Sequence, residues 1–214
     1  MSAPRTARRY VDDALMRATD IVIAIVMLVC AAPVLLGVAI AIRLESPGPS
    51  LFRQRRIGRG GVMFTVFKFR SMSVEADPEV HRAYVARLAA EGGPDNGTMR
   101  KLTGDRRVTR VGAIIRKTSL DEWPQLFNVL AGTMSIVGPR PAVEYELDLY
   151  SPVHFDRFRV RPGLTGLWQV SGRSRLGFVE MLDLDVEYVR SRNLASNLRI
   201  MARTPRALLE AQTA

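Results

Sequence analysis

Residues 116–130 read RKTSLDEWPQLFNVL, and the rest of the chain is organised around this stretch. Two cations and two hydroxyls lead into adjacent carboxylates, Asp121 and Glu122, and apolar residues at helical spacing follow them. Ser119 and Glu122 have the spacing of a capping box, and Pro124 is tolerated only near the start of a helix. The stretch therefore predicts that both carboxylates lie in the first turn of a helix, where backbone N–H groups favour anions.

Adjacent carboxylates at a helix start have two interpretations. Neighbouring helical residues point about 100° apart, so each carboxylate can serve a different ligand. Such a place suits a site that holds a phosphate, a metal ion and a nucleophile together. A bare Ser-x-x-Glu pattern also fits plain helix capping, and the stretch alone does not decide between the two.

Composition restricts both the fold and the partners. With 214 residues, 47% of them hydrophobic, the chain can form one domain with or without an appendage. Its 31 Lys and Arg against 21 Asp and Glu give a formal net charge of +10. That charge indicates a polyanionic partner: nucleic acid, an anionic membrane surface or a phosphorylated substrate. A single cysteine, Cys30, excludes an internal disulfide, and its apolar neighbours predict a buried thiol.

Residues 21–42 form an uncharged apolar run that is long enough to cross the hydrocarbon layer as a helix. Pro33 interrupts this run and predicts a kink. Arginines flank both ends of the run, whereas a spanning helix is expected to have its positive charges on one side. The charges therefore favour a kinked hairpin that enters and leaves the same leaflet, over a simple span or a buried helix of a soluble domain.

Two strand-like runs, 51–57 and 62–70, follow a Ser-Pro-Gly-Pro breaker at 46–49. A glycine-rich turn joins them, so the pattern predicts a β-hairpin. The period of two places Lys68 and Arg70 on one face of the second strand.

The remaining chain alternates helical patterns with rigid turns. Residues 76–90 have a helical pattern. In GPRP at 138–141, prolines on both sides of Arg140 limit its backbone freedom, which suits an arginine kept ready for an anion. The segment after residue 192 predicts two short basic amphipathic helices broken at Pro205, compatible with a membrane interface and equally with packing on the domain.

The expected fold is α/β, mixed and helix-rich, in three parts. Residues 1–46 are expected to form a re-entrant membrane helix hairpin, and residues 47–192 a small cytoplasmic catalytic domain with a short β-hairpin. Residues 193–214 are expected to form an amphipathic tail at the membrane interface. His81 and His154 have no partners at metal-ligand spacing, so no zinc site is predicted.

Taken together, these pieces resemble the bacterial sugar transferases known as small-form monotopic phosphoglycosyl transferases. The resemblance runs from Asp20 to the C-terminal helices. It rests on five motifs in order: Pro33 in the apolar run, KFRSM at 68–72, SLDE at 119–122 running into QLFNVL, GPRP at 138–141, and RPGLTG at 161–166 followed by Gly-Arg at 172–173. Each motif alone is weak, and their order and spacing make the resemblance specific.

This resemblance implies an activity and a location. Such an enzyme transfers a sugar 1-phosphate from a nucleotide diphosphate sugar, usually a UDP-sugar, to polyprenyl phosphate and releases UMP. It catalyses the first membrane step in the assembly of glycoconjugates such as exopolysaccharide or lipopolysaccharide. The implied cofactor is Mg²⁺, and the implied place is the cytoplasmic face of the bacterial inner membrane, with the lipid bilayer as partner and no nucleic acid. The sugar, the polyprenol, the pathway and the formation of a homodimer stay open.

The resemblance also assigns roles to residues. Asp121 matches the nucleophile that attacks the phosphorus bearing the sugar, Glu122 matches a Mg²⁺ ligand, and Arg116 matches an arginine near this dyad. The residues assigned to substrate phosphate or nucleotide binding are Lys68, Arg70, Arg140, Pro141, Arg161 and Arg173. Ala32 stands before Pro33 where family members often have Ser, so a hydroxyl that could satisfy the broken backbone is missing.

Three other classes of protein were weighed. A non-catalytic peripheral protein that binds anionic lipid through its arginines gives no reason for the Asp121–Glu122 dyad or for GPRP. Nucleic-acid binding needs basic residues interleaved with exposed aromatic residues, and the long apolar run argues against it. A haloacid-dehalogenase-type phosphatase needs an N-terminal Asp-x-Asp-x-Thr signature, which the sequence lacks.

Overall fold

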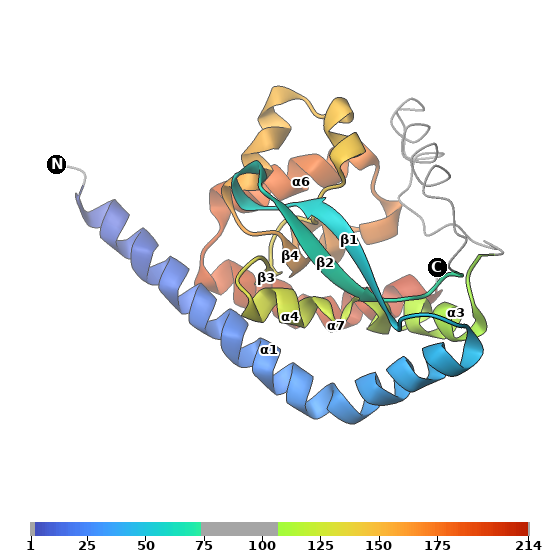
Figure 1. Ribbon diagram of the computed structural model, residues 1–214. Coiled ribbons are helices and arrows are strands. Elements are labelled where there is room, and N and C mark those ends of the chain that lie inside the picture. The colour runs from blue at the N-terminus through green and yellow to red at the C-terminus, as the bar shows by residue number, and fades with distance from the viewer. Residues whose placement is uncertain (1–2, 74–106, 214) are drawn as a thin grey trace.

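The computed structural model describes residues 3–73 and 107–213, so the helix predicted at 76–90 lies outside the described residues. Within the described part, helices surround two small two-stranded sheets (Figure 1). The predicted mixed, helix-rich class is confirmed.

Helix α1, Ala3–Glu45, contains the apolar run and Pro33 and continues through both. Figure 1 shows a bend that divides α1 into a longer N-terminal arm and a shorter C-terminal arm, as expected where proline removes a backbone hydrogen bond. The predicted kink is therefore present, in one bent helix instead of two antiparallel helices. Entry into and exit from a single leaflet stays a prediction.

The outward face of α1 is apolar and exposed. Among the described residues, Tyr10–Glu45 is the one helical segment long and apolar enough to cross a membrane. Its exposed large side chains include Val22, Ile25, Val26, Val29, Val34, Leu36, Ile40 and Leu44. Cys30 is also exposed, so the prediction of a buried thiol is wrong, because the outward face of the helix has no protein cover.

A β-hairpin follows α1 as predicted. Strands β1, Leu51–Ile57, and β2, Met63–Phe69, pair antiparallel, with Leu51 opposite Phe69 and Ile57 opposite Met63. The 3-10 helix η1, Arg59–Gly61, makes the turn, and Gly60 and Gly61 have φ of 71° and 76°, which glycine adopts without strain. The hairpin carries Lys68 toward the centre of the domain.

The central elements come next in the chain. Helix α3, Arg110–Lys117, leads through the 3-10 helix η2, Leu120–Glu122, into helix α4, Gln125–Leu130. Strand β3, Ser135–Val137, then pairs in parallel with β4, Gly163–Thr165. A side chain at Gly163 would clash, because its Cβ would lie 2.0 Å from the backbone N of Gly138. The glycines of the GPRP and RPGLTG motifs therefore allow two backbones to touch.

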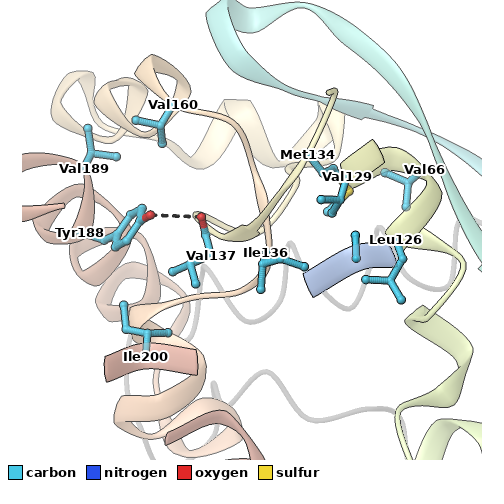
Figure 2. Packing of buried hydrophobic residues seen from close by; sticks show 11 residues of the cluster. Val66, Leu126, Val129, Met134, Ile136, Val137, Val160, Tyr188, Val189 and Ile200 are labelled. Atoms are coloured by element: carbon cyan, nitrogen blue, oxygen red, sulfur yellow. Dashed lines mark hydrogen bonds between the residues drawn. The ribbon is translucent and has the colours of Figure 1, made fainter. Parts of the chain in front are cut away.

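One hydrophobic core joins these elements to α1 (Figure 2). Its buried members come from α1, β2, α4, β3 and the C-terminal helices: Ala24, Val66, Leu126, Val129, Met134, Ile136, Val137, Val160, Tyr188, Val189 and Ile200. Figure 2 shows the Tyr188 ring reaching β3, where its hydroxyl donates to the Val137 carbonyl at 3.1 Å. The inner side of α1 is thus part of the core of the domain that follows it in the chain.

The C-terminal half is mainly helical. It contains the 3-10 helices η3, Glu144–Leu149, η4, Pro152–Arg159, and η5, Arg173–Arg175, and the helices α5, Leu167–Ser171, α6, Phe178–Ser191, and α7, Leu194–Thr213. Trp168 of α5 is buried in a second cluster with Leu176, Phe178, Met181 and Leu182.

Helix α7 corrects one prediction, because it is a single helix that continues through Pro205. Packing offsets the cost of the proline: Ile200 is buried in the core, and the Thr204 hydroxyl lies 2.9 Å from the Thr165 hydroxyl of β4. Of the two interpretations left open for this segment, packing on the domain is confirmed. A role at the membrane interface stays a prediction, consistent with exposed Leu198 and Leu209.

Candidate active site

The two carboxylates of the dyad lie in η2, the 3-10 turn between α3 and α4. The predicted capping box is wrong. Ser119 adopts left-handed φ of 57° where the chain leaves α3, and its side chain makes no capping hydrogen bond. Its hydroxyl instead accepts a hydrogen bond from Arg173 Nη2 at 3.3 Å. Both side chains of the expected box therefore have other partners: Ser119 contacts Arg173, and Glu122 contacts Lys68.

Lys68 and Glu122 form the central ion pair of the site. Lys68 Nζ lies 3.2 Å from Glu122 Oε1, and both side chains are partly open to solvent. Asp121 is buried, with 7% of its surface exposed. The two adjacent carboxylates therefore have different surroundings, and a ligand can reach Glu122 by displacing an exposed ammonium group.

A buried asparagine holds this arrangement together. Asn128 of α4 donates from Nδ2 to the Thr65 carbonyl at 2.7 Å and accepts from the Phe67 N–H at 3.0 Å. These two bonds fix α4 to β2, and so fix the dyad relative to Lys68. Sequence reasoning missed this residue, because only the pairing of α4 with β2 shows that its amide matches two backbone groups.

The C-terminal arm of α1 shares a hydrophobic cluster with η2 and contacts α3. Leu120 packs against a cluster made by Ile42, Phe69 and Ile115. The carboxylate of Glu45, the last residue of α1, accepts the N–H groups of Arg110 and Val111 at 2.7 and 2.9 Å and so caps α3. The end of the apolar helix is thus built into the support of the site.

Arg140 is held by a buried carboxylate that the sequence did not indicate. Arg140 Nη1 lies 2.9 Å from Glu146 Oε1, and Glu146 is fully buried. Burial raises the pKa of Glu146, but the charges of Arg140 and Arg56 and the Val143 N–H outweigh burial and lower the pKa below its ordinary value. Glu146 is therefore ionised and orients Arg140. Burial lowers the pKa of Arg140, but the charge of Glu146 and, to a lesser extent, that of Glu122 raise it above its ordinary value.

Two further arginines support the backbone around Arg140. Arg56 Nη1 donates to the Pro141 carbonyl at 3.0 Å, so the structure gives Pro141 a structural contact. Arg157 Nη2 donates to the Arg140 carbonyl at 2.7 Å and to Asp185 Oδ2 at 2.5 Å. The side chains of Arg157 and Asp185 are both buried. The GPRP turn is consequently rigid for reasons beyond its two prolines.

The structure separates the other predicted phosphate ligands. Arg116 lies in the last turn of α3, which packs on η2. Arg70 is buried, and its guanidinium donates to the carbonyls of Pro47 and Ser46 at 2.7 and 2.8 Å, at the end of α1. Arg161 Nε donates to the Gly132 carbonyl at 2.8 Å, beyond the C-terminal end of α4. Lys68 contacts Glu122 and Arg173 contacts Ser119 beside the dyad, whereas Arg140 is held by Glu146. Arg70 and Arg161 donate to backbone carbonyls elsewhere.

The dyad is the candidate place for a metal ion among the residues that the structure describes. That part contains no group of three or more His, Cys, Asp or Glu side chains able to hold a metal ion. Mg²⁺ does not need one, since it is commonly bound by one or two carboxylates together with waters and substrate phosphates. The hard oxygen donors of the dyad, with partly open Glu122, fit that kind of ion.

Together, an exposed apolar helix long enough to cross a membrane, a carboxylate dyad and the cations around it define a domain suited to anionic substrates. Comparison with known proteins identifies the family: the bacterial sugar transferase model matches residues 11–211, and the chain belongs to this family. The exopolysaccharide production protein ExoY of Sinorhizobium fredii is 42% identical over 88% of this chain and 82% of its own.

Two further relatives are named by their reactions. The UDP-glucose:undecaprenyl-phosphate glucose-1-phosphate transferase of Caulobacter vibrioides is 42% identical over 96% of this chain and 74% of its own. The undecaprenyl-phosphate galactose phosphotransferase of Salmonella typhimurium is 40% identical over 91% of this chain and 40% of its own. The resemblance found from the sequence motifs is thereby confirmed.

Proposed function

We propose that this sugar transferase moves a sugar 1-phosphate from a UDP-sugar to polyprenyl phosphate, through a covalent intermediate on Asp121. The observation that carries the proposal is the buried Asp121 beside the Lys68–Glu122 pair, in a turn supported by the end of α1. The two relatives whose names give a reaction act on undecaprenyl phosphate, and their names link them to glucose or galactose. Such a reaction begins the membrane stage of exopolysaccharide assembly.

The proposed chemistry proceeds in two displacements. A carboxylate oxygen of Asp121 attacks the phosphorus that bears the sugar, and the bond from that phosphorus to the bridging oxygen breaks, releasing UMP. A phosphate oxygen of polyprenyl phosphate then attacks the same phosphorus and displaces Asp121, giving polyprenyl diphosphate sugar. A nucleophilic side chain thus divides one difficult transfer between two anions into two easier steps.

Cations near the dyad are proposed to hold the phosphates. Lys68 and Arg173 lie close to the dyad by their contacts, and Arg116 and Arg140 are proposed to act beside them. Preorganised positive charge favours the transition state because it does not have to reorient when the phosphoryl group moves. Arg140 meets that requirement best, since buried Glu146 fixes its guanidinium.

Glu122 is proposed to hold Mg²⁺ through its carboxylate oxygens. A bound Mg²⁺ would neutralise negative charge on the phosphoryl oxygens during transfer. Lys68 contacts the same carboxylate, so it keeps Glu122 in place before the substrate arrives. Glu122→Gln is expected to weaken the dependence of turnover on Mg²⁺ concentration. The amount of folded protein should stay close to that of wild type.

A rapid-quench experiment tests the covalent route. Enzyme in membranes is mixed with radiolabelled UDP-sugar and Mg²⁺, without polyprenyl phosphate, and is assayed for UMP and for label on the protein. We expect about one UMP per active site and a protein adduct that hydroxylamine cleaves, as it cleaves an acyl phosphate. No UMP before acceptor is added, with full turnover afterwards, would favour direct transfer between two bound substrates. No UMP in either case would favour the non-catalytic lipid-binding protein.

We further propose that α1 is re-entrant, so that the protein is monotopic on the cytoplasmic face of the inner membrane. The arginines on both flanks and the bend of α1 support this topology. Single cysteines introduced as Arg8→Cys and Arg55→Cys, in a Cys30→Ala background, are expected to be shielded from an impermeant thiol reagent in intact cells. Labelling of one and not the other would establish a spanning helix.

A further inference from the structure

A second basic site lies apart from the dyad. A cleft of about 80 Å³ is lined by side chains from α1, η1, the segment before β4 and the junction of α6 and α7. Its cationic members are five arginines: Arg17, Arg59, Arg159, Arg161 and Arg192. Two aspartates, Asp13 and Asp20, also line it, together with polar Ser135, Tyr188 and Asn197. The cleft therefore combines an excess of positive charge with hydrogen-bonding groups.

The two aspartates are already engaged with the protein. Asp20 accepts from the Ser135 hydroxyl at 2.7 Å and from the Ile136 N–H at 2.9 Å. Asp13 pairs with Arg192 at 2.6 Å. Neither aspartate therefore needs a further cation from the cleft.

Two of the arginines donate hydrogen bonds to backbone carbonyls, which are neutral groups. These bonds do not neutralise the positive charge of the guanidinium groups. Arg17 donates to the carbonyls of Val129 and Leu130 at 2.8 and 3.2 Å, and Arg161 donates to Gly132. Burial, and then the charges of Arg17 and Arg59, lower the pKa of Arg161. Mutual repulsion of this kind is relieved when an anion binds between the cations.

The cleft lies at the opposite end of α4 from the dyad. Asp121 and Glu122 precede α4, whereas Arg17 and Arg161 bind the carbonyls that end it. Helix α4, Gln125–Leu130, lies between Glu122 and Gly132, and its six residues alone span roughly 9 Å along the axis. The apolar run of α1 begins directly after Asp20, so the cleft lies at the N-terminal end of that run. If α1 enters the bilayer, this is the level of the lipid phosphates.

We propose that the cleft is a second anion site, which binds a phosphate group independently of the dyad. The phosphate belongs to an anionic lipid headgroup at the membrane surface or to a free phosphate, and these sources share the same recognition by guanidinium groups. The lipid source rests on the proposed membrane location of α1, whereas the anion site itself does not. Arg161, expected from the sequence to bind substrate, serves this site instead.

The test measures melting temperatures with and without phosphate. One arm titrates inorganic phosphate against the full-length protein in a neutral detergent, with sodium chloride at equal ionic strength as the reference. The other arm compares nanodiscs of phosphatidylcholine with nanodiscs that also contain phosphatidylglycerol. A ligand at tenfold excess over its dissociation constant is expected to raise the melting temperature by roughly 3–6 °C.

Matched variants locate the effect. Arg59→Gln/Arg159→Gln removes two exposed cations from the cleft, and Asp156 keeps Arg190 as a partner when Arg159 is lost. The control, Arg53→Gln/Arg55→Gln, removes the same charge from exposed positions of β1 outside the cleft. The cleft variant should lose most of the rise, and the control should keep it.

Each outcome decides the proposal. A rise only with phosphatidylglycerol identifies the lipid headgroup, and a rise with inorganic phosphate as well identifies any phosphate. No rise in either arm, or an equal loss in both variants, overturns the site. The Asp121→Asn variant must still show the rise in melting temperature. Loss of the rise in this variant would place the anion at the dyad and overturn the proposal of a separate site. UMP release reports on the proposed reaction, so failure of one proposal is distinguishable from failure of the other.

Discussion

Helix α4 has carboxylates before its first turn and arginines around its last carbonyls, and the two sets differ in what they contact. At the C-terminal end, Arg17 and Arg161 donate to the backbone oxygens of Val129, Leu130 and Gly132. At the N-terminal end, Glu122 contacts the ammonium of Lys68, a flexible side chain. Both arrangements follow the helix dipole. The carbonyl contacts build the fold, whereas the ion pair between side chains can open for a substrate.

Asp121→Asn should have the largest effect and should leave the C-terminal end of α4 intact. The amide keeps the shape of the side chain and removes the anionic nucleophile. Turnover should fall by at least about 10⁴-fold, the scale seen when a nucleophile is removed. UMP release measures the loss, and the melting temperature should stay within a few degrees of wild type. Residual turnover of one tenth or more would mean that Asp121 acts only on the metal or as a base.

Arg140→Ala should have the next largest effect, and it separates rate from stability. Loss of a preorganised charge from the phosphoryl group should lower the rate by about 10²–10³. It should also lower the melting temperature by about 10 °C, because buried Glu146 loses its partner.

The double variant Arg140→Ala/Glu146→Gln distinguishes the two losses. It should recover part of the melting temperature, because the unpaired buried charge is removed as well. Its rate should not recover. Recovery of both would mean that Arg140 is purely structural.

Arg161→Gln should behave in the opposite way to a variant of the dyad. Loss of a charged hydrogen bond to a carbonyl typically costs about 1.5–3 kcal/mol, a fall in melting temperature of roughly 3–10 °C. Turnover and KM for the UDP-sugar should stay close to wild type, with Arg55→Gln on exposed β1 as the control. A hundredfold loss of activity without a change in melting temperature would show that Arg161 binds substrate. The two ends of α4 would then not differ in the way described above.

The smallest expected effect is on the melting temperature at acid pH, and it comes from Glu146. Its pKa in the folded protein is below the ordinary value of 4.5, so its ionised form stabilises the fold above that pH. This stabilisation is lost as the pH falls from 4.5 through the lowered pKa of the folded protein. Melting temperatures should therefore fall less steeply below about pH 4.5 in Glu146→Gln than in wild type. Glu144→Gln, an exposed neighbour on η3, should follow the wild-type curve.

Local patterns in the sequence predicted the local structure well. The glycine turn and the period of two gave the β-hairpin to within a residue or two, and the apolar spacing gave α4. The motif order gave the family. These features depend on neighbours in the chain, which the sequence displays directly.

Features that depend on distant partners were missed or misassigned. Ser119 and Glu122 match a local capping box, but Arg173 and Lys68 engage them from other parts of the chain. Arg70 was assigned to substrate although the open end of α1 binds its guanidinium. Asn128 and Glu146 carried no motif, because their importance comes from burial and from partners brought together by the fold.

The way α1 is built into the domain has a practical consequence for protein production. Ala24 and Ile42 are buried in two different clusters of the domain, and Glu45 caps α3. Cutting the chain at residue 46, where composition suggests a boundary, would expose those clusters and remove the carboxylate that accepts the N–H groups of Arg110 and Val111, leaving only Thr109 to cap α3. A water-soluble catalytic fragment is therefore better sought by replacing the outward apolar side chains of α1 with polar ones than by removing the helix.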